Sequence, residues 1–303
     1  MILKDLPIGA KVREQKSSVV FLVADHNHTG YRGTALVTDC VIKLACIDAA
    51  EPDNPDAGRK EFGNNFYPQS NIHQWLNANE ADWYKPAHKF DAPPVAENVD
   101  HGRLDFYDVP FYSNEAKFAG DFSYKDDPGF LTWFAKEFVD RLCEVEVPCH
   151  VDPAPGKVQH GPPVPHHLKA KAFLLSAPEL GFEEAQSVTE GFRFPLFNDG
   201  RMRVAAPTPA AIHRPADYVY DDCSMYYWVR TAARGSSSVC LLYDSDHRIG
   251  DFRSTPVGSR TPSGLTHARS VSGIRPALNL DSNVSVSEKP DSNGVFTLVL
   301  GGE

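Results

Sequence analysis

The sequence lacks the two kinds of segment that would direct it into or across a membrane. No run of about 18 apolar residues occurs, so no transmembrane helix is expected. The first ten residues, MILKDLPIGA, contain no cationic stretch followed by an apolar run of signal-peptide length. We therefore expect a cytoplasmic protein with no signal peptide and no membrane insertion.

The sequence also lacks a surplus of basic residues. Lys and Arg total 30 against 40 Asp and Glu, which gives a formal net charge of -10. Nucleic-acid binding needs a concentrated basic face, so this balance argues against a nucleic-acid partner. Because 42% of the residues are hydrophobic, the chain has enough apolar side chains for a sizeable core.

Motifs of common catalytic and metal sites are missing as well. Neither His-Glu-x-x-His, Gly-x-Ser-x-Gly nor a Gly-rich phosphate loop occurs, although the chain has 12 His. The cysteines lack the close pairing of a zinc site, and the favoured interpretation is reduced, mostly buried thiols at Cys40, Cys46, Cys143, Cys149, Cys223 and Cys240. These absences favour a binding protein over an enzyme, with no cofactor and no metal.

Strands are predicted near both ends of the chain. Val19–Ala24 and Thr34–Thr38 are short apolar runs rich in β-branched residues, and polar turn residues separate them. This pattern predicts an antiparallel hairpin. Val295–Leu300 predicts a closing strand, which we expect in the same sheet region as Val19–Ala24.

Two helices are predicted between these strands. Ser70 is a helix cap that precedes apolar residues on one helical face. Pro128–Leu142 has the clearest helical period, with apolar positions at Phe130, Leu131, Phe134, Phe138 and Leu142. Terminal strands with helices between them predict a single α+β domain over residues 1–303.

Two polar stretches interrupt these elements. Residues 85–124 and 151–167 are rich in Pro and show little periodicity, so both predict loop insertions. After them, Lys171–Leu175 predicts a strand, and Ser176–Leu180 predicts the start of a short helix.

The amino-acid alphabet of residues 229–287 is unusually restricted. These positions contain no Lys, Glu, Gln, Met or Trp, whereas the rest of the chain contains 41 of these residues. At that rate about ten would be expected in the segment by composition alone. Seven Arg and four Asp are present, so the segment does not avoid charge. Physical chemistry gives no reason for a loop to admit Arg and Asp yet exclude Lys and Glu.

The genetic code offers an explanation for this alphabet. Randomising both adenines of an Asn codon that ends in a pyrimidine gives every residue type except Lys, Glu, Gln, Met and Trp, and no stop codon. The same five types are missing here. A small-residue, turn-rich composition is the alternative explanation.

Residues on both sides of this segment resemble a known family. Trp228-Val229-Arg230 followed by Gly273–Leu278 (GIRPAL) is similar to the closing segments of C-type-lectin-fold proteins of the formylglycine-generating-enzyme type. The likeness is greatest to the variable proteins of diversity-generating retroelements, which occur in bacteria and their phages. Shorter upstream matches, to bacterial and phage proteins with the same ending, are Leu6-Pro7-Ile8-Gly9, Trp75-Leu76-Asn77, Phe173-Leu174-Leu175-Ser176 and Glu179-Leu180.

The resemblance implies a fold and a function. The implied fold is C-type-lectin-like, of the formylglycine-generating-enzyme type, with loop-rich insertions. In that family, template adenines are copied with errors into a C-terminal variable segment. The implied function is therefore binding of a protein or cell-surface ligand through a hypervariable region at residues 229–273. If the chain is phage-encoded, a virion-associated location is implied instead of a cytoplasmic one.

Stability would then reside in Trp228, Ile274, Leu278 and the upstream core, while variable side chains project from loops. We expect residues 230–272 to be largely irregular. Aromatic side chains give rigid contact area, and Arg and Asp give directional charged hydrogen bonds. The candidate ligand-binding residues are Tyr243, Asp244, Asp246, His247, Arg248, Asp251, Phe252 and Arg253.

Two rival functions stay open at this point. A calcium-dependent carbohydrate-binding lectin would need clustered carboxylate and amide oxygens, for which Glu51-Pro52-Asp53-Asn54 and Asp244/Asp246 are the candidates. A formylglycine-generating-like oxidase would need a reactive cysteine pair near the C-terminus. Only Cys223 and Cys240 are available, and neither lies in a matching context.

Overall fold

The computed structural model describes residues 1–100, 122–151, 164–182, 190–212, 225–233, 239–243 and 265–301. Its strands are β1 (Lys11–Arg13), β2 (Val20–His26), β3 (Thr34–Thr38), β4 (Lys43–Ala45), β5 (Val145–Val151), β6 (Val164–Ala170), β7 (Ala172–Leu174), β8 (Tyr227–Ala232), β9 (Val239–Tyr243), β10 (Leu265–His267), β11 (Ser272–Ile274), β12 (Pro276–Leu280), β13 (Ser285–Val286) and β14 (Val295–Val299).

The helices of the described residues are few and short. The α-helices are α1 (Ala57–Phe62), α2 (Asn71–Asn77) and α3 (Lys136–Arg141). The 3-10 turns are η1 (Leu3–Asp5), η2 (Tyr67–Gln69), η4 (Phe130–Trp133), η6 (Pro195–Asn198), η7 (Gly200–Arg203) and η8 (Ala210–Ile212). In the described part of the chain, none of these helices is long and apolar enough to cross a membrane.

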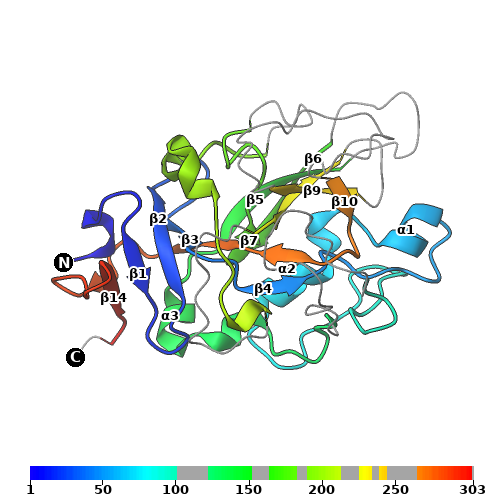
Figure 1. Ribbon diagram of the computed structural model, residues 1–303, viewed down its shortest axis with the longest axis horizontal. Helices are drawn as coiled ribbons and strands as arrows, with labels where there is room; N and C mark the ends of the chain where they lie inside the picture. The colour runs from blue at the N-terminus through cyan, green and yellow to red at the C-terminus, as the bar shows by residue number, and fades with distance from the viewer. Residues whose placement is uncertain are drawn as a thin grey trace, which may run out of the picture.

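The largest sheet joins the two ends of the chain. Its strand order is β13-β14-β1-β2-β3-β12-β7, and both termini lie at its β13–β14 side (Figure 1). β1 pairs with β14 on one side, in parallel, and with β2 on the other side, antiparallel. The expected hairpin of β2 and β3 and the closing strand β14 are therefore confirmed, in one sheet. The mixture of sheets and short helices confirms the α+β class.

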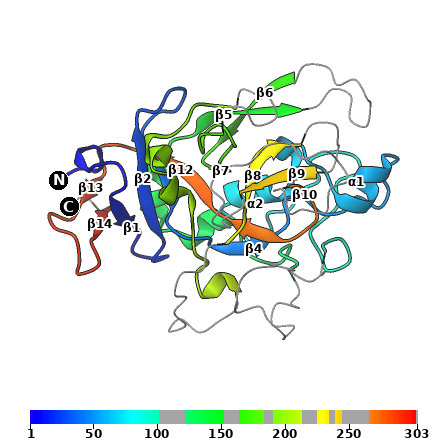
Figure 2. The same ribbon diagram turned by 45° about the horizontal axis from the view of Figure 1, so that its top comes forward.

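The second sheet has the strand order β10-β9-β8-β11-β4. β8 pairs with β9 antiparallel and with β11 in parallel, so β8 is the central strand. β5 and β6 form a separate hairpin, and β5 lies against β8 (Figure 2). The expected insertion at 151–167 is thus partly wrong. Val151 ends β5 and Val164 begins β6, while residues 152–163 lie outside the described residues.

Residues 85–100 and 122–124, which belong to the other expected insertion, contain no helix or strand, and 101–121 lie outside the described residues. The described part is packed on the molecule by hydrogen bonds. Ala50 N donates to Asn98 O at 2.8 Å, and Tyr124 N donates to Pro94 O at 3.0 Å. Residues 85–100 and 122–124 therefore form loops that pack against the rest of the molecule.

The β2–β3 turn shows why glycine is needed near the sheet. Gly33 has φ +83°, and a Cβ added there would lie 2.5 Å from the Leu280 carbonyl oxygen of β12. A side chain would therefore be both strained and sterically excluded. The close approach lets β3 pair with β12 over Thr34–Val37 and Ala277–Leu280.

Helix α2 begins where the sequence predicts. The Ser70 hydroxyl accepts a hydrogen bond from His73 N at 3.3 Å, which satisfies a free donor of the first turn. The apolar face of α2 is fully buried through Ile72, Trp75 and Leu76. The Trp75 ring packs on Phe130 with centroids 5.5 Å apart, and its Nε1 donates to Pro128 O at 3.0 Å.

The single helix predicted over Pro128–Leu142 is wrong in one respect, because the chain breaks it into η4 and α3. Phe134 and Ala135 are extended, with ψ of 160° and 147°. Lys16 Nζ donates to Thr132 O and Phe134 O at 3.0 Å each, and the Glu14 carboxylate accepts from Ala135 N at 3.3 Å. These distant side chains satisfy the backbone groups that a continuous helix would have paired internally.

The aromatic stripe of this region is still buried, as expected. Phe134 lies 4.9 Å from Phe130 and 4.8 Å from Phe138 between ring centroids, and Phe138 stacks on Phe21 of β2. A second departure concerns Ser176–Leu180, which forms a turn rather than a helix. The Glu179 carboxylate there accepts from Ser176 N at 3.0 Å, so the side chain closes the turn.

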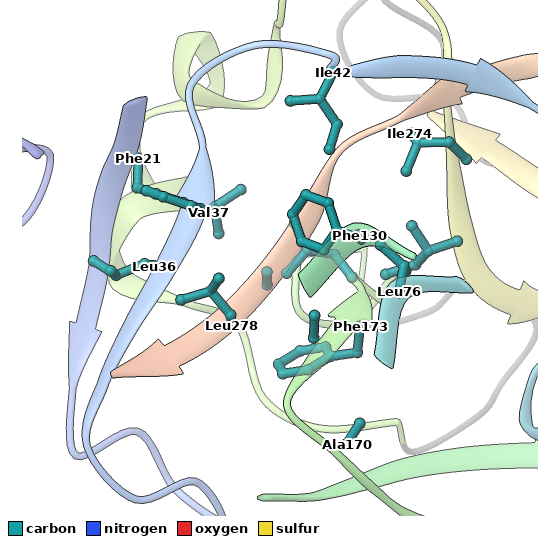
Figure 3. Packing of buried hydrophobic residues seen from close by; sticks show 14 of the residues in the cluster. Phe21, Leu36, Val37, Ile42, Leu76, Phe130, Ala170, Phe173, Ile274 and Leu278 are labelled. Carbon is teal, nitrogen blue, oxygen red and sulfur yellow. The ribbon is translucent and has the colours of Figure 1, made fainter. Parts of the chain in front are cut away.

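One continuous hydrophobic cluster spans both sheets. Figure 3 shows Leu36 and Val37 of β3, Leu278 of β12 and Phe173 of β7 in this cluster, together with Phe130 and Leu76. Ile274 of β11 extends the same cluster into the second sheet. The candidate site therefore stands on a scaffold that shares its core with the terminal strands.

Buried carboxylates attach residues 85–99 to this core. Asp48 is 1% exposed and accepts hydrogen bonds from Asn64 N and Asn71 N at 3.0 and 2.9 Å. Asn71 Nδ2 in turn donates to Asp91 at 3.2 Å. Burial raises the pKa of Asp48 well above its ordinary value, and the nearby Asp91 charge adds to the rise. Burial likewise raises the pKa of Glu51.

This raised pKa predicts a pH-dependent stability. A carboxyl group whose folded-state pKa is raised contributes stability below its unfolded pKa of about 4 and loses it as pH rises through the folded value. Relative to Asp48→Asn, the wild type should therefore lose free energy of unfolding as pH increases. Urea unfolding of both proteins across the acidic and neutral range measures this difference.

The matched control is Asp53→Asn, which changes an exposed carboxylate of the same region. Because the Asp53 side chain is exposed, its replacement should change the free energy of unfolding by less than about 0.5 kcal/mol. If the Asp48→Asn difference did not change with pH, or sloped in the opposite direction, ionisation of Asp48 would not be costly in the folded state.

Candidate ligand-binding site

The structure describes the two points where the predicted binding segment leaves and rejoins the fold. Tyr243 is the last residue of β9, and Leu265 is the first of β10. β9 and β10 pair antiparallel with Leu241 opposite Leu265, so the two points are neighbours at one end of the second sheet. The other candidate residues lie outside the described residues: Asp244, Asp246, His247, Arg248, Asp251, Phe252 and Arg253.

The expectation that residues 230–272 are largely irregular is wrong for the part that the structure describes. Arg230–Ala232 complete β8, and β9, β10 and the start of β11 follow within the same span. The reason is that Val239–Tyr243 is an apolar run that pairs on both sides, with β8 and with β10. Residues 234–238 and 244–264, which connect these strands, lie outside the described residues.

Trp228 fixes β8 in the core. Its side chain is fully buried, and its Nε1 donates to Ala45 O of β4 at 2.9 Å. Ile274 of β11 is equally buried. A Cβ added at Gly273 would lie 2.5 Å from Tyr226 O, so the close β11–β8 approach needs glycine there. The residues expected to supply stability therefore do lie in the scaffold.

Arg230 of β8 is a buried arginine with an extensive set of hydrogen bonds. It is 2% exposed and forms a bidentate ion pair with Glu179, with Nη1–Oε2 and Nη2–Oε1 distances of 2.6 and 2.8 Å. Its guanidinium also donates to the backbone oxygens of Pro148, Leu174 and Glu190 at 2.8–2.9 Å. A buried charge requires this degree of pairing.

The network extends through the side chains of Tyr31, Glu190, Thr231 and His150. Tyr31 donates its hydroxyl to Glu179 Oε1 at 2.5 Å. Glu190 accepts from Thr231 Oγ1 at 2.5 Å and forms an ion pair with His150 Nδ1 at 2.7 Å. Although burial raises the pKa of Glu190, the His150 hydrogen bond and the His150 and Arg230 charges hold it below the ordinary value. The network thus ties β8 to the β2–β3 turn and to β5.

Arg275 plays a similar structural part on the other side of β8. It is 1% exposed, and its Nε donates to Thr38 O at 3.0 Å. Its Nη1 lies within hydrogen-bonding distance of Met202 O, Arg203 O and the Tyr227 hydroxyl, at 2.9–3.2 Å. Two of the seven arginines in the restricted alphabet are therefore scaffold residues rather than surface residues.

Helix α1 supports the return of the chain after β10. His267 stacks on Phe62, with centroids 3.7 Å apart and an angle of 12° between the rings. Arg269 N donates to Phe62 O at 2.9 Å, and Ile47 N donates to Ala268 O at 3.0 Å. Burial and the Arg269 charge lower the pKa of His267. Sequence reasoning missed Phe62, which lies about 200 positions from its partner, because no local pattern links them.

The structure describes only some of the carboxylates and cysteines that the two rival functions would need. Within the described ranges, no group of three or more His, Cys, Asp or Glu side chains is placed to hold a metal ion. Glu51 accepts from Asn54 Nδ2 and pairs with His88 Nε2 at 3.1 Å, so both its oxygens have internal contacts. Cys40, Cys46, Cys143 and Cys149 are free thiols. Cys223 lies outside the described residues, and Cys240 lies in β9.

Comparison with known proteins gives one match. A family model described as a domain of unknown function (DUF6273) matches residues 32–282. The matched range runs from the β2–β3 turn to the end of β12 and includes both flanks of the candidate segment. No curated protein and no solved structure matches the chain.

Proposed function

We propose that this chain, which belongs to the DUF6273 domain family, is a ligand-binding protein whose C-terminal segment is diversified by a retroelement. The ligand is a protein or a cell-surface molecule, recognised by Tyr243 at the end of β9 and by the residues between β9 and β10. We further propose that the α+β scaffold is of the C-type-lectin, formylglycine-generating-enzyme type, and that it has no enzymatic activity.

The observation that carries this proposal is the restricted alphabet of residues 229–287. Burial accounts for the absence of Lys and Glu in β8, β11 and β12, whose side chains are almost all buried. It does not account for residues 244–264, where Arg and Asp occur without Lys or Glu. Random replacement of adenines in Asn codons produces this combination.

The geometry of the flanks supports the same function. A diversified segment must begin and end at fixed points, because its own sequence cannot be relied on for stability. Here the exit strand β9 lies against β8, which Trp228 and Arg230 hold in the core. The return after β10 is held by Phe62. Substitutions between these points would leave the scaffold contacts intact.

A variant with six serines tests tolerance of the segment. If these side chains project from the fold as proposed, replacing Tyr243, His247, Arg248, Asp251, Phe252 and Arg253 together by Ser should leave the melting temperature nearly unchanged, because single surface substitutions typically change stability by less than about 0.5 kcal/mol in either direction and so largely cancel. Differential scanning calorimetry measures the change. A loss of several kcal/mol would mean that these side chains are part of the scaffold.

Ligand recognition is tested with a library of variants of this protein. Such a library can be selected against any purified target protein, so the natural ligand need not be known. A displayed library randomised at these six positions is selected against two unrelated purified proteins. Binders to both targets are expected, because aromatic and Arg side chains on a fixed base supply interface energy. The matched control library randomises six exposed scaffold positions: Asp5, Arg32, Glu80, Asp82, Lys85 and Glu97. Equal yields from both libraries would contradict a dedicated binding segment.

A further inference from the structure

A basic and partly apolar patch lies on the surface around η6 and η7. Its residues are Phe182, Phe192, Arg193, Met202, Arg203 and Val204. Phe192 is 62% exposed and Val204 39% exposed, which makes them two of the large apolar side chains most open to water. η6 packs beside β2, whereas β9 and β10 lie toward the opposite end of the molecule (Figures 1 and 2). The patch is therefore distant from β9 and β10, the strands that flank the proposed diversified segment.

Two arginines converge at the centre of this patch. A Cβ placed on Gly181 would lie 2.6 Å from Arg193 Cδ and 3.0 Å from Arg203 Nη2. Gly181 has φ +93°, which also favours glycine. The two arginine side chains thus meet over a residue that has no side chain of its own.

Arg203 is held in place by neutral groups. Its Nε donates to Leu180 O at 2.7 Å and its Nη2 to Phe197 O at 3.0 Å, while the guanidinium lies 4.9 Å from the Phe182 ring centroid. Among the described residues, no carboxylate forms an ion pair with Arg193 or Arg203. Arg201 differs, because Asp199 neutralises it at 2.8 Å.

The positive charge of Arg193 and Arg203 contrasts with the net charge of the whole chain, which is -10. A pair of guanidinium groups suits carboxylates, which accept hydrogen bonds from two N–H groups at once. The adjacent Phe192 and Val204 suit apolar side chains. A nucleic-acid backbone would instead need an extended basic surface, and an acidic chain repels it.

We propose that this patch is a second, constant interaction surface, which binds an acidic peptide segment of a partner protein carrying apolar side chains beside its carboxylates. The proposal does not depend on diversification of residues 244–264. Arg193 and Arg203 pair with the carboxylates, and Phe192 packs against the apolar side chains. Arg and aromatic residues with this arrangement are typical of energetically dominant interface positions.

The probe is a random-peptide phage library selected on the full chain, with prior depletion on Arg193→Glu. Enriched peptides should combine Asp or Glu with aliphatic or aromatic residues. A synthetic copy should bind Arg193→Glu at least about tenfold more weakly than wild type by fluorescence anisotropy, because a charged hydrogen bond is lost and repulsion is added. Phe192→Ser should also weaken binding.

The matched control is Arg201→Glu, a charge reversal at an exposed arginine of the same turn. It should leave the affinity within about twofold of wild type, a difference too small to represent a lost contact. Glu183 and Glu184, which lie outside the described residues, are present in every variant, so differences report the arginines. Peptides without acidic residues, no Arg193-dependent peptides, or tighter binding of an oligothymidine would each overturn the proposal.

Discussion

Replacing Arg230 by methionine is expected to lower the free energy of unfolding by about 3–5 kcal/mol, the range found when one partner of a buried ion pair is removed. The Glu179 carboxylate is fully buried, so without Arg230 it loses both charged hydrogen bonds at 2.6 and 2.8 Å. The backbone oxygens of Leu174 and Pro148 lose their donors as well. Urea unfolding followed by far-UV circular dichroism measures the loss.

A double substitution shows whether the loss comes from an unpaired charge. Arg230→Met with Glu179→Leu removes both charges and should recover much of the stability, because apolar replacements of a buried pair are often tolerated. Arg201→Met breaks an exposed ion pair and should lower the free energy of unfolding far less than Arg230→Met. If Arg230→Met cost no more than Arg201→Met, the network would not hold β8.

The second large effect concerns Trp228. Trp228→Ala should lower the free energy of unfolding by about 3–5 kcal/mol, as expected for a large side chain removed from a packed core. The ring is fully buried, and its Nε1 hydrogen bond to Ala45 O joins β8 to β4, two strands away in the same sheet. The loss is measured by the same unfolding experiment.

Trp133→Ala provides a comparison for Trp228→Ala with the same change in volume. Trp133 is only partly buried and packs at the edge of the aromatic stripe against Trp75 and Phe130. Its removal should cost clearly less than removal of Trp228. Equal losses of unfolding free energy would show that the fold depends on Trp228 of β8 no more than on Trp133 of η4.

The sequence predicts the elements whose causes are local. The β2–β3 hairpin follows from two apolar runs with a polar turn between them, and α2 follows from the Ser70 cap and the apolar face behind it. The predicted Pro128–Leu142 helix fails because Glu14 and Lys16, more than 100 positions away, bind its backbone. No pattern within the helix itself records those partners.

The candidate site, too, can be predicted from the sequence only in part. Its flanks were identified from Trp228 and the Gly273–Leu278 ending, and both lie in the core. The partners that hold these flanks could not be predicted, since Glu179 and Phe62 are distant in sequence from Arg230 and His267. Arg230 illustrates the difficulty, because a charged residue in a variable alphabet suggests the surface while its contacts place it in the interior.

The central claim is that a constant scaffold carries a segment diversified at adenines. Deep sequencing of the encoding gene in a population of closely related cells tests it directly. Substitutions should concentrate in the codons for residues 243–253, fall at adenine positions of a matching template repeat, and spare the codons for Arg230, Ile274 and Arg275, whose side chains are buried. Substitutions spread evenly along the gene, or falling equally on all four nucleotides, would contradict the claim.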